Sequence, residues 1–347
     1  MTNMCVEQTT ATRIRWAVEL ADSVQDLAWS PDGRWLAAAG VSGPLNLIAS
    51  TTGAVDREWP GHEGGTLQLA WSRESRWLAS SGQDGLARIW DPNHDEEQQR
   101  LLGGNRWVGG VRFSPYADLL ITAAGKELRA WTLDGQLLCT TQPHASTITS
   151  LDWHPRQAVL ASSASGPLHL WDWRAAEAVA EHRLPQVSST LIVRWSPNGR
   201  YLVCGCQDNC LRGWIWPECQ GFQMLGYASK LTALAWDRAS RWLATADREL
   251  VALWDFTDGP PVGESPHYIE GPLDTVRDMA FHPRRPWLAA GDRSGSLLVW
   301  SRHGWEYHLI WHGALRGGFQ RLAWHPQERL LAVGGEDGTV AAFEFAR

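Results

Sequence analysis

The chain has 347 residues, a formal net charge of −7 at pH 7 and no run of Lys or Arg, so its composition gives no sign of a nucleic-acid-binding surface. No stretch approaches about 18 consecutive apolar residues and the N-terminus lacks the apolar core of a signal peptide, so we expect a cytoplasmic protein without membrane contact. Six cysteines in a chain of this length do not make a disulfide framework.

The N-terminal segment differs from the rest of the chain. Residues 1–12 are expected to form a flexible tail, and residues 13–20, "RIRWAVEL", alternate as a β-strand does. The stretch "LAWSPDGRWLAAAG", at 27–40, then predicts two strands joined by a tight turn. Close copies of it recur, such as "LAWSRESRWLAS" at 69–80 and "LAWHPQERLLA" at 322–332. We therefore treat residues 13–347 as a single domain built from repeats.

Each copy is marked by an aromatic residue and by a leucine seven positions later. A third landmark, Trp or Phe, comes 18 or 19 positions after the first aromatic residue in seven copies, and Ile48 replaces it in the first copy. Recurrence every 40 to 45 residues is the sign of a repeat architecture, here with eight units. The first aromatic residues are Trp29, Trp71, Phe113, Trp153, Trp195, Trp236, Phe281 and Trp324.

Each unit contains enough sequence for four strands. "SSGQDGLARIWD", at 80–91, predicts two strands around a "QDG" turn, and a further apolar stretch such as "WEYHLIW", at 305–311, precedes the next unit. A four-stranded sheet of about 40 residues cannot bury both of its faces alone, but it can when similar sheets flank it radially. The pattern therefore predicts an all-β propeller of four-stranded antiparallel blades.

Short motifs add a family resemblance to this pattern. "IWD" at 89–91, "LWD" at 170–172 and 253–255, and "GH" at 61–62 resemble the signature of the Trp-Asp (WD) repeat β-propeller family. The resemblance covers about residues 13–347. In that family a His, a Ser or Thr, an Asp and a Trp of one blade form a buried hydrogen-bonded set. The resemblance implies this structural role for His62, Ser80, Asp84 and Trp90.

The number of blades is predicted from the two ends of the chain. The family most often shows seven repeats, whereas eight units are counted here, and the last unit ends after its third strand at "TVAAFEFAR". Residues 13–20 can supply the missing outer strand, which would remove an exposed sheet edge. We therefore predict a closed propeller of eight blades. Seven blades with one copy displaced is the alternative.

Four of the six cysteines lie within 204–219, "CGCQDNCLRGWIWPEC". Cys204 and Cys206 share one face of a strand and Cys210 begins the next strand, whereas Cys219 belongs at the opposite rim. Structural zinc commonly takes four ligands, and this hairpin offers three cysteines. Other units have Ser, Ala or Gly at the first two positions, so small buried residues are the simpler interpretation. Metal capture and redox pairing stay open, and our prediction assigns no metal and no cofactor.

Three histidines come directly after a first aromatic residue, in "WHP" or "FHP" motifs: His154, His282 and His325. The motif places all three at one rim, and the last two belong to consecutive units. A shared metal would need a third ligand that the sequence does not supply. We therefore interpret these residues as turn histidines whose hydrogen bonds are satisfied.

Charged residues near the first aromatic residues form two triplets that alternate in sign. One consists of Arg112, Asp152 and Arg194 in units three to five, and the other of Asp278, Arg321 and Asp26 in units seven, eight and one. If these positions line a central channel, each triplet is a set of mutually compensating ion pairs. The functional alternative is a channel mouth that binds an anion or a partner.

The position six residues before the first aromatic residue suggests a partner contact. It is small or polar in every unit except the third, where Trp107 comes after Arg106, and in the sixth it is Lys230. In the family this strand entrance lies at the surface most often used for partners, and Trp and Arg are enriched in binding hot spots. By contrast, Trp305, Tyr307 and Trp311 alternate along one strand, so we expect them to pack between blades.

No motif indicates catalysis. The chain has no P-loop, nucleophile elbow, H-E-x-x-H motif or dinucleotide fingerprint. We therefore expect a non-enzymatic scaffold or adaptor that holds one or more partner proteins on its rim and is a monomer outside its complex. The alternative is an accessory propeller that handles a small molecule or a metal during cofactor or complex assembly, through the channel charges or the cysteine hairpin.

Overall fold

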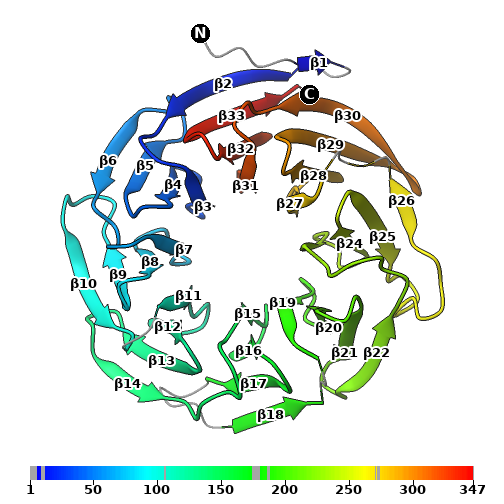
Figure 1. The fold of residues 1–347 in the computed structure, drawn as a ribbon, viewed down its shortest axis with the longest axis horizontal. Coiled ribbons are helices and arrows are strands. Elements are labelled where there is room, and N and C mark those ends of the chain that lie inside the picture. Colours follow the sequence, from blue (N-terminus) through cyan, green and yellow to red (C-terminus); the bar gives the residue numbers. More distant parts are fainter. Residues whose placement is uncertain are drawn as a thin grey trace. The chain divides into compact units, whose positions relative to one another are not determined.

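The computed structural model describes residues 6–8, 12–104, 107–173, 180–185, 188–269, 271 and 274–346. Strands are its regular elements, and no helix in these ranges is long and apolar enough to cross a membrane. The described strands form eight antiparallel sheets, which we call blades 1 to 8 in chain order (Figure 1). The predicted all-β fold of eight four-stranded blades is therefore confirmed.

Blades 1 to 4 are formed by strands that are consecutive in the sequence. Blade 1 contains β3 (Val24–Trp29), β4 (Trp35–Gly40), β5 (Leu45–Ala49) and β6 (Val55–Trp59). Blade 2 contains β7 (Thr66–Trp71), β8 (Leu78–Gly82), β9 (Leu86–Trp90) and β10 (Glu97–Leu102). Blade 3 contains β11 (Val108–Phe113), β12 (Leu119–Ala124), β13 (Glu127–Thr132) and β14 (Leu137–Thr140). Blade 4 contains β15 (Ser150–Trp153), β16 (Val159–Ser163), β17 (Leu168–Asp172) and β18 (Ala180–Leu184).

Blades 5 to 7 repeat this order, and blade 8 takes its fourth strand from the start of the chain. Blade 5 contains β19 (Thr190–Trp195), β20 (Tyr201–Cys206), β21 (Leu211–Ile215) and β22 (Gln220–Met224). Blade 6 contains β23 (Ala233–Trp236), β24 (Trp242–Asp247), β25 (Leu250–Asp255) and β26 (His267–Ile269). Blade 7 contains β27 (Val276–Phe281), β28 (Trp287–Asp292), β29 (Ser296–His303) and β30 (Glu306–Ala314), with β1 (Val6–Gln8) added at its edge. Blade 8 contains β31 (Phe319–Trp324), β32 (Leu330–Gly335), β33 (Thr339–Phe345) and β2 (Thr12–Glu19).

The strand register explains the seven-residue spacing of the sequence landmarks. In every blade the first aromatic residue lies directly opposite its leucine across the hairpin of the first two strands, so six intervening residues close that hairpin. In blades 2 to 8 the same leucine also lies opposite the third landmark, as Leu78 does with Trp90. The landmarks therefore form one apolar row across three strands, where cross-strand pairs stabilise the sheet.

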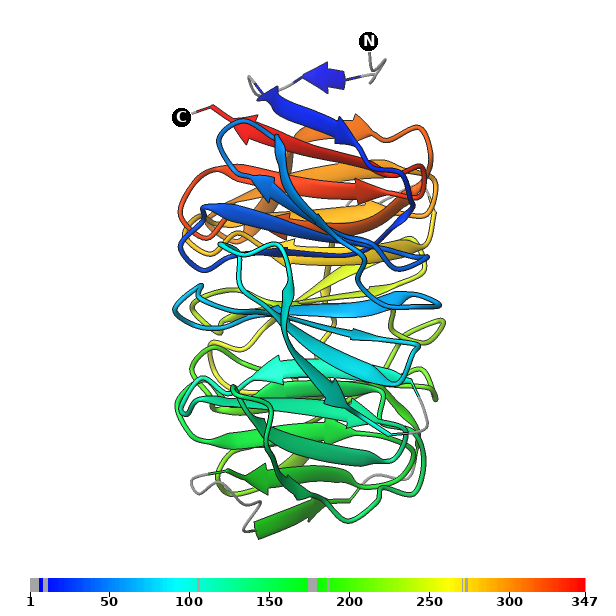
Figure 2. The same cartoon turned by 90° about the vertical axis from the view of Figure 1, so that its left-hand side faces the viewer.

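The N-terminal strand completes blade 8. β2 pairs antiparallel with β33, with Ile14 opposite Phe343, and Figure 2 shows the blue strand beside the red one. Trp16 on this strand is 7% exposed, and its indole N–H donates to the carbonyl of Ser50 (2.7 Å). The prediction that residues 13–20 supply this outer strand is confirmed, with bounds shifted by one residue, and the seven-blade alternative is excluded.

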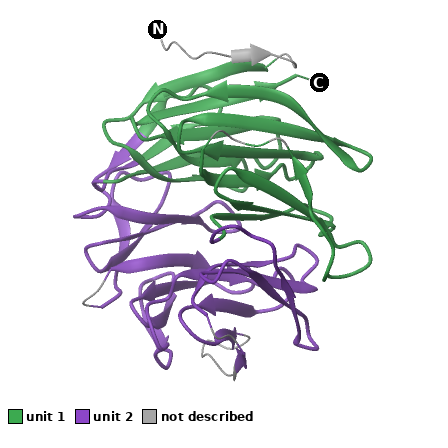
Figure 3. Ribbon diagram, turned by 45° about the vertical axis from the view of Figure 1, so that its right-hand side comes forward, with its two compact units in different colours: residues 1–41, 46–56, 231–347 green, residues 42–45, 57–230 purple. Residues whose placement is uncertain are grey.

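The chain divides into two compact units, which Figure 3 colours separately. Unit 1 consists of residues 1–41, 46–56 and 231–347, and unit 2 of residues 42–45 and 57–230. Inside each unit, buried clusters lie between consecutive blades. Trp311, Phe319 and Phe343 belong to the cluster of blades 7 and 8, for example. This distribution explains how thin sheets bury both faces.

The three turn histidines connect consecutive blades within a unit. Nε2 of His154 lies 3.1 Å from the carbonyl oxygen of Gly199, and Nε2 of His325 lies 2.9 Å from that of Gly33. His282 makes the equivalent contact with Glu328 O at 3.2 Å. Nδ1 of each ring accepts a backbone N–H of its own turn, so each ring donates through Nε2–H. Their interpretation as satisfied turn histidines is confirmed.

Candidate functional site

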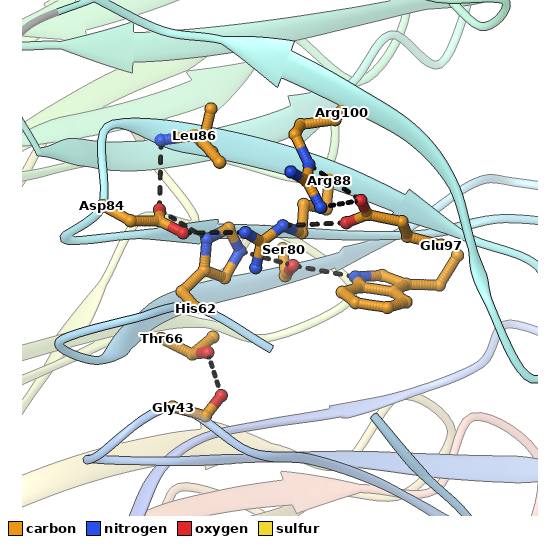
Figure 4. Close-up of polar contacts among 10 residues, drawn as sticks. Gly43, His62, Thr66, Ser80, Asp84, Leu86, Arg88, Glu97 and Arg100 are labelled. Atoms are coloured by element: carbon orange, nitrogen blue, oxygen red, sulfur yellow. Dashed lines mark hydrogen bonds and ion pairs between the residues drawn. The ribbon is translucent and has the colours of Figure 1, made fainter. Parts of the chain in front are cut away.

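The four residues of the expected hydrogen-bonded set meet inside blade 2, and Figure 4 labels His62, Ser80 and Asp84 among them. His62 precedes β7, Ser80 lies on β8, Asp84 lies in the turn to β9, and Trp90 ends β9. The indole N–H of Trp90 donates to Ser80 Oγ at 2.8 Å, and the same hydroxyl lies 2.7 Å from His62 Nε2. His62 Nδ1 lies 2.8 Å from Asp84 Oδ1.

Donor chemistry fixes the direction of these bonds. Because the Trp90 indole is only a donor, the Ser80 hydroxyl accepts from it and donates its own proton to His62 Nε2. His62 then carries its proton on Nδ1 and donates it to Asp84. Burial lowers the pKa of His62, which keeps the ring neutral, as this arrangement requires. Arg88 holds the other carboxylate oxygen of Asp84 at 3.0 Å, so the set is a structural device with its polar groups paired.

Blade 4 contains a second, shorter set that sequence reasoning missed. His144 Nε2 lies 2.8 Å from Ser162 Oγ, and the indole N–H of Trp171 donates to the same oxygen at 2.7 Å. The ring of His169 stacks on that of His144, with centroids 4.2 Å apart. The available signal was the spacing, because 18 residues separate His from Ser here, as they separate His62 from Ser80.

The first charge triplet lies on the first strands of blades 3, 4 and 5. Arg112, Asp152 and Arg194 are half-buried. Asp152 Oδ2 accepts the backbone N–H of Trp195 at 2.7 Å, so this carboxylate joins blade 4 to blade 5. Each arginine donates to the carbonyl of the residue before it, at 2.8 Å for Arg112 and 2.9 Å for Arg194. Burial raises the pKa of Asp152, and the positive charges of both arginines oppose that shift.

The second triplet lies in unit 1, on β27, β31 and β3. Asp278 Oδ2 accepts the backbone N–H of Leu322 at 3.1 Å, as Asp152 does in the other triplet. Arg321 Nε lies 3.6 Å from Asp26 Oδ1. Burial raises the pKa of Asp278, against the charge of Arg321. A role of either triplet as a channel mouth stays a prediction.

The predicted partner contacts lie at strand entrances. Trp107, just before β11, is 59% exposed, and Leu102, at the end of β10, is 63% exposed. We call residues 102–107 the Trp107 loop; Arg106 lies outside the described residues. Lys230, before β23, is also exposed. Their use as partner contacts stays a prediction.

The ring of Trp305 contacts Trp242 and Arg241 of blade 6, as packing between blades requires, but the expectation that it is buried there is wrong. Trp305 is 61% exposed, whereas Trp311 of the same hairpin is fully buried and Tyr307 is partly buried. The register places Trp305 in the two-residue turn between β29 and β30, because His303 pairs with Glu306. A bulge between Val299 and Trp300 further changes the alternation along β30.

The cysteine hairpin lies in blade 5. Cys204 and Cys206 are fully buried and Cys210 is 1% exposed, whereas Cys219 lies in the turn between β21 and β22 and is partly buried. The two thiols of β20 are 3.7 Å apart. This agrees with the expectation that Cys204 and Cys206 share one face of a strand, that Cys210 begins the next strand and that Cys219 lies beyond that strand's other end.

These blades and their His–Ser–Trp hydrogen bonds define a β-propeller built from four-stranded repeats. The family model "WD domain, G-beta repeat" (WD40) matches more than half of the chain, at residues 19–43, 53–91, 135–172, 182–214, 263–301 and 310–343. The protein belongs to the WD40 family. The six matched ranges do not include the first three strands of blade 3 or of blade 6. The spacing of the aromatic and leucine landmarks nevertheless identifies both blades in the sequence.

Curated relatives share parts of the chain. RACK1, a small ribosomal subunit protein of Drosophila melanogaster, is 29% identical over 142 residues, which are 38% of this chain and 44% of RACK1. The transcriptional corepressor LEUNIG_HOMOLOG of Arabidopsis thaliana is 23% identical over 201 residues, 56% of this chain and 24% of its own length. Protein tipD of Dictyostelium discoideum is 21% identical over 306 residues, 85% of this chain and 50% of its own length. The chain thus spans half or less of each relative.

A solved structure shows the same fold. The computationally designed Ika8 protein superposes with a TM-score of 0.79 at 19% sequence identity, over 94% of this chain and 97% of that one. At this identity the likeness concerns the fold alone.

Proposed function

We propose that this protein is a non-enzymatic interaction scaffold that binds a partner protein through the Trp107 loop. The observation that carries the proposal is a solvent-exposed tryptophan, 59% exposed, at a strand entrance where the other units have small or polar residues or a lysine. Burying such a side chain supplies apolar contact area at a small cost in conformational entropy. The names of RACK1 and LEUNIG_HOMOLOG describe a ribosomal subunit protein and a corepressor, which supports a role without catalysis.

Residues 102–104, at the start of the Trp107 loop, are held in place by hydrogen bonds within the chain. A guanidinium N–H of Arg129 donates to the carbonyl of Leu102 at 2.7 Å, and the backbone N–H of Gly103 donates to the carbonyl of Gly85 at 2.9 Å. Gly104 has a φ of +126°, a conformation that side-chain-bearing residues rarely adopt. Residues that are already held, as Leu102 and Gly103 are, lose little freedom on binding, so more of their contact energy appears as affinity.

Capture of the tagged protein from its host, read by mass spectrometry, tests the proposal with two tryptophan variants. Trp107→Ala should weaken a captured partner's binding about 30-fold or more, the effect of a hot-spot residue worth at least about 2 kcal/mol. Trp305→Ala is the matched control because that side chain is equally exposed, at 61%, but belongs to unit 1. A partner that binds the Trp107→Ala protein as tightly as the parent contradicts the proposal.

A further inference from the structure

The hairpin of blade 5 is a modified copy of the hairpin of blade 2. "CGCQDNCLR", at 204–212, matches "SSGQDGLAR", at 80–88, position by position around a shared Asp. The structure retains the Asp–Arg pair in both copies: Arg88 Nη2 lies 3.0 Å from Asp84 Oδ2, and Arg212 Nη2 lies 2.7 Å from Asp208 Oδ2. What differs is that three thiols replace a hydroxyl, a glycine hydrogen and an isobutyl group. The replacements are Cys204 for Ser80, Cys206 for Gly82 and Cys210 for Leu86.

The cysteine at the glycine position occupies space that an imidazole fills in blade 2. A β-carbon built on Gly82 would lie 2.2 Å from Cγ of His62, so a side chain there and the histidine ring exclude each other. Blade 5 carries Cys206 at this position. In blade 5 the Cys206 thiol therefore lies beside Asp208. At the equivalent place in blade 2 the His62 ring lies beside Asp84.

The side chains gather as metal ligands do. Ligand atoms of Cys206, Asp208 and Cys210 all lie within 4.8 Å of one another, and the thiol of Cys210 lies 3.0 Å from Asp208 Oδ1. The sulfur of Cys204 is 3.7 Å from that of Cys206. A tetrahedral ion with metal–sulfur bonds of about 2.3 Å requires sulfur atoms about 3.8 Å apart, so this separation already fits one edge of the tetrahedron.

The surrounding charge also suits a cation with anionic ligands. Arg212 donates to both oxygens of Asp208, at 3.1 and 2.7 Å, and these bonds hold the pKa of that carboxyl well below its usual range. Asp208 is therefore ionised and oriented. Cysteine thiols are ordinarily protonated at neutral pH, so a metal that binds them must displace their protons.

We propose that this hairpin is a binding site for a tetrahedral divalent transition-metal ion of the zinc class, with Cys206, Cys210 and Asp208 as ligands and Cys204 as the fourth. Each cysteine that ligates releases one proton to solvent, whereas Asp208 releases none, so three protons leave per ion bound and affinity rises with pH. Soft thiolates favour zinc-like ions over magnesium or calcium. Arg212 orients the carboxylate from outside the ligand set and offsets one negative charge.

Cobalt(II) tests the site because tetrahedral thiolate coordination gives it intense visible and near-ultraviolet absorption. The reduced, metal-free full chain is titrated with cobalt chloride, and the bound cobalt is then displaced by competition with zinc chloride. We expect one ion per chain, a thiolate-to-metal charge-transfer band and the release of three protons. Arg212→Gln should weaken binding about 10- to 100-fold, as loss of an outer-shell partner does.

The chain supplies its own test and control variants. Cys210→Leu and Cys204→Ser introduce the residues that blade 2 accommodates at these positions, so at least one should fold, as judged by circular dichroism. Each should remove the charge-transfer band or reduce its intensity and weaken binding at least 100-fold. Cys219→Ser, in the same blade but outside the cluster, should bind cobalt like the parent. Cobalt binding without the thiolate band, unchanged binding in the first two variants, or an equal loss in Cys219→Ser overturns the proposal. The result is independent of partner binding at the Trp107 loop.

Discussion

Two neighbouring serines on β8 allow a sharp test of the hydrogen-bonded set in blade 2. Ser80 and Ser81 are both fully buried. The Ser80 hydroxyl bonds to both His62 and Trp90, whereas the Ser81 hydroxyl has no hydrogen-bond partner among the described residues. The same change, Ser→Ala, therefore removes two hydrogen bonds at one position and none at the next.

The expected magnitudes differ accordingly. Ser80→Ala leaves the indole N–H of Trp90 and Nε2 of His62 buried without partners, and each unsatisfied group costs about 1–3 kcal/mol. After subtracting the desolvation cost of the lost hydroxyl itself, we expect a loss of about 3 kcal/mol in the free energy of unfolding. Ser81→Ala removes an unpaired buried hydroxyl, so its effect should lie between zero and a gain of about 1 kcal/mol.

Urea unfolding monitored by tryptophan fluorescence measures both variants against the parent. A shift of the midpoint without a change in slope reports stability directly. Equal effects of the two substitutions, or a loss below about 1 kcal/mol for Ser80→Ala, would refute the argument that this hydroxyl stabilises the blade through its two bonds.

Two further predictions concern other buried contacts. Burial lowers the pKa of His282 from 6.5 to about 4, so the unfolded chain binds the proton first. The stability that neutral His282 provides is therefore lost as pH falls from about 6.5 towards 4, by about 2 kcal/mol between pH 7 and pH 5. Urea unfolding at pH 7 and pH 5 should show this extra loss of stability in the parent but not in His282→Ser. The control is His303→Ser, because His303 is exposed. Equal pH dependence of the stability in the parent and in His282→Ser would exclude the mechanism. Gly82→Ala should lower the melting temperature by several degrees, because the added β-carbon would lie 2.2 Å from the His62 ring. Gly109→Ala should leave the melting temperature unchanged, because no atom lies within 4 Å of its added β-carbon. Similar melting temperatures of the two variants would contradict this reasoning.

The sequence predicted the repeat and the strands because their signals are local. An aromatic residue and a leucine seven positions apart lie opposite each other in one hairpin. Their spacing in the sequence therefore specifies how the two strands of that hairpin pair. The sequence also indicates that blade 8 takes its outer strand from the N-terminal segment. The last unit contains only three strand patterns, and apolar and polar residues alternate along residues 13–20. The His62 set was expected from a resemblance that covers the same blade.

Features that depend on turns and bulges were not predictable in this way. Trp305 was expected to be buried from strand alternation, but a two-residue turn carries it to the surface. The sequence indicates three cysteines that lie near one another in this hairpin. That the carboxylate of Asp208 lies beside them and is hydrogen-bonded by Arg212 is visible only in the structure. Side-chain direction at a turn depends on backbone geometry that residue type does not specify.

The architecture of this protein follows from the amino-acid pattern alone: eight units, four strands in each unit, and the apolar row that crosses three of those strands. Short-range periodicity decides these features, because a strand buries every second side chain and a hairpin closes over a few residues. Which side chains of different strands and turns meet is set by the three-dimensional arrangement. The contact of His325 with the carbonyl of Gly33, and the position of the Cys206 thiol beside Asp208, depend on distances between segments that no local pattern encodes.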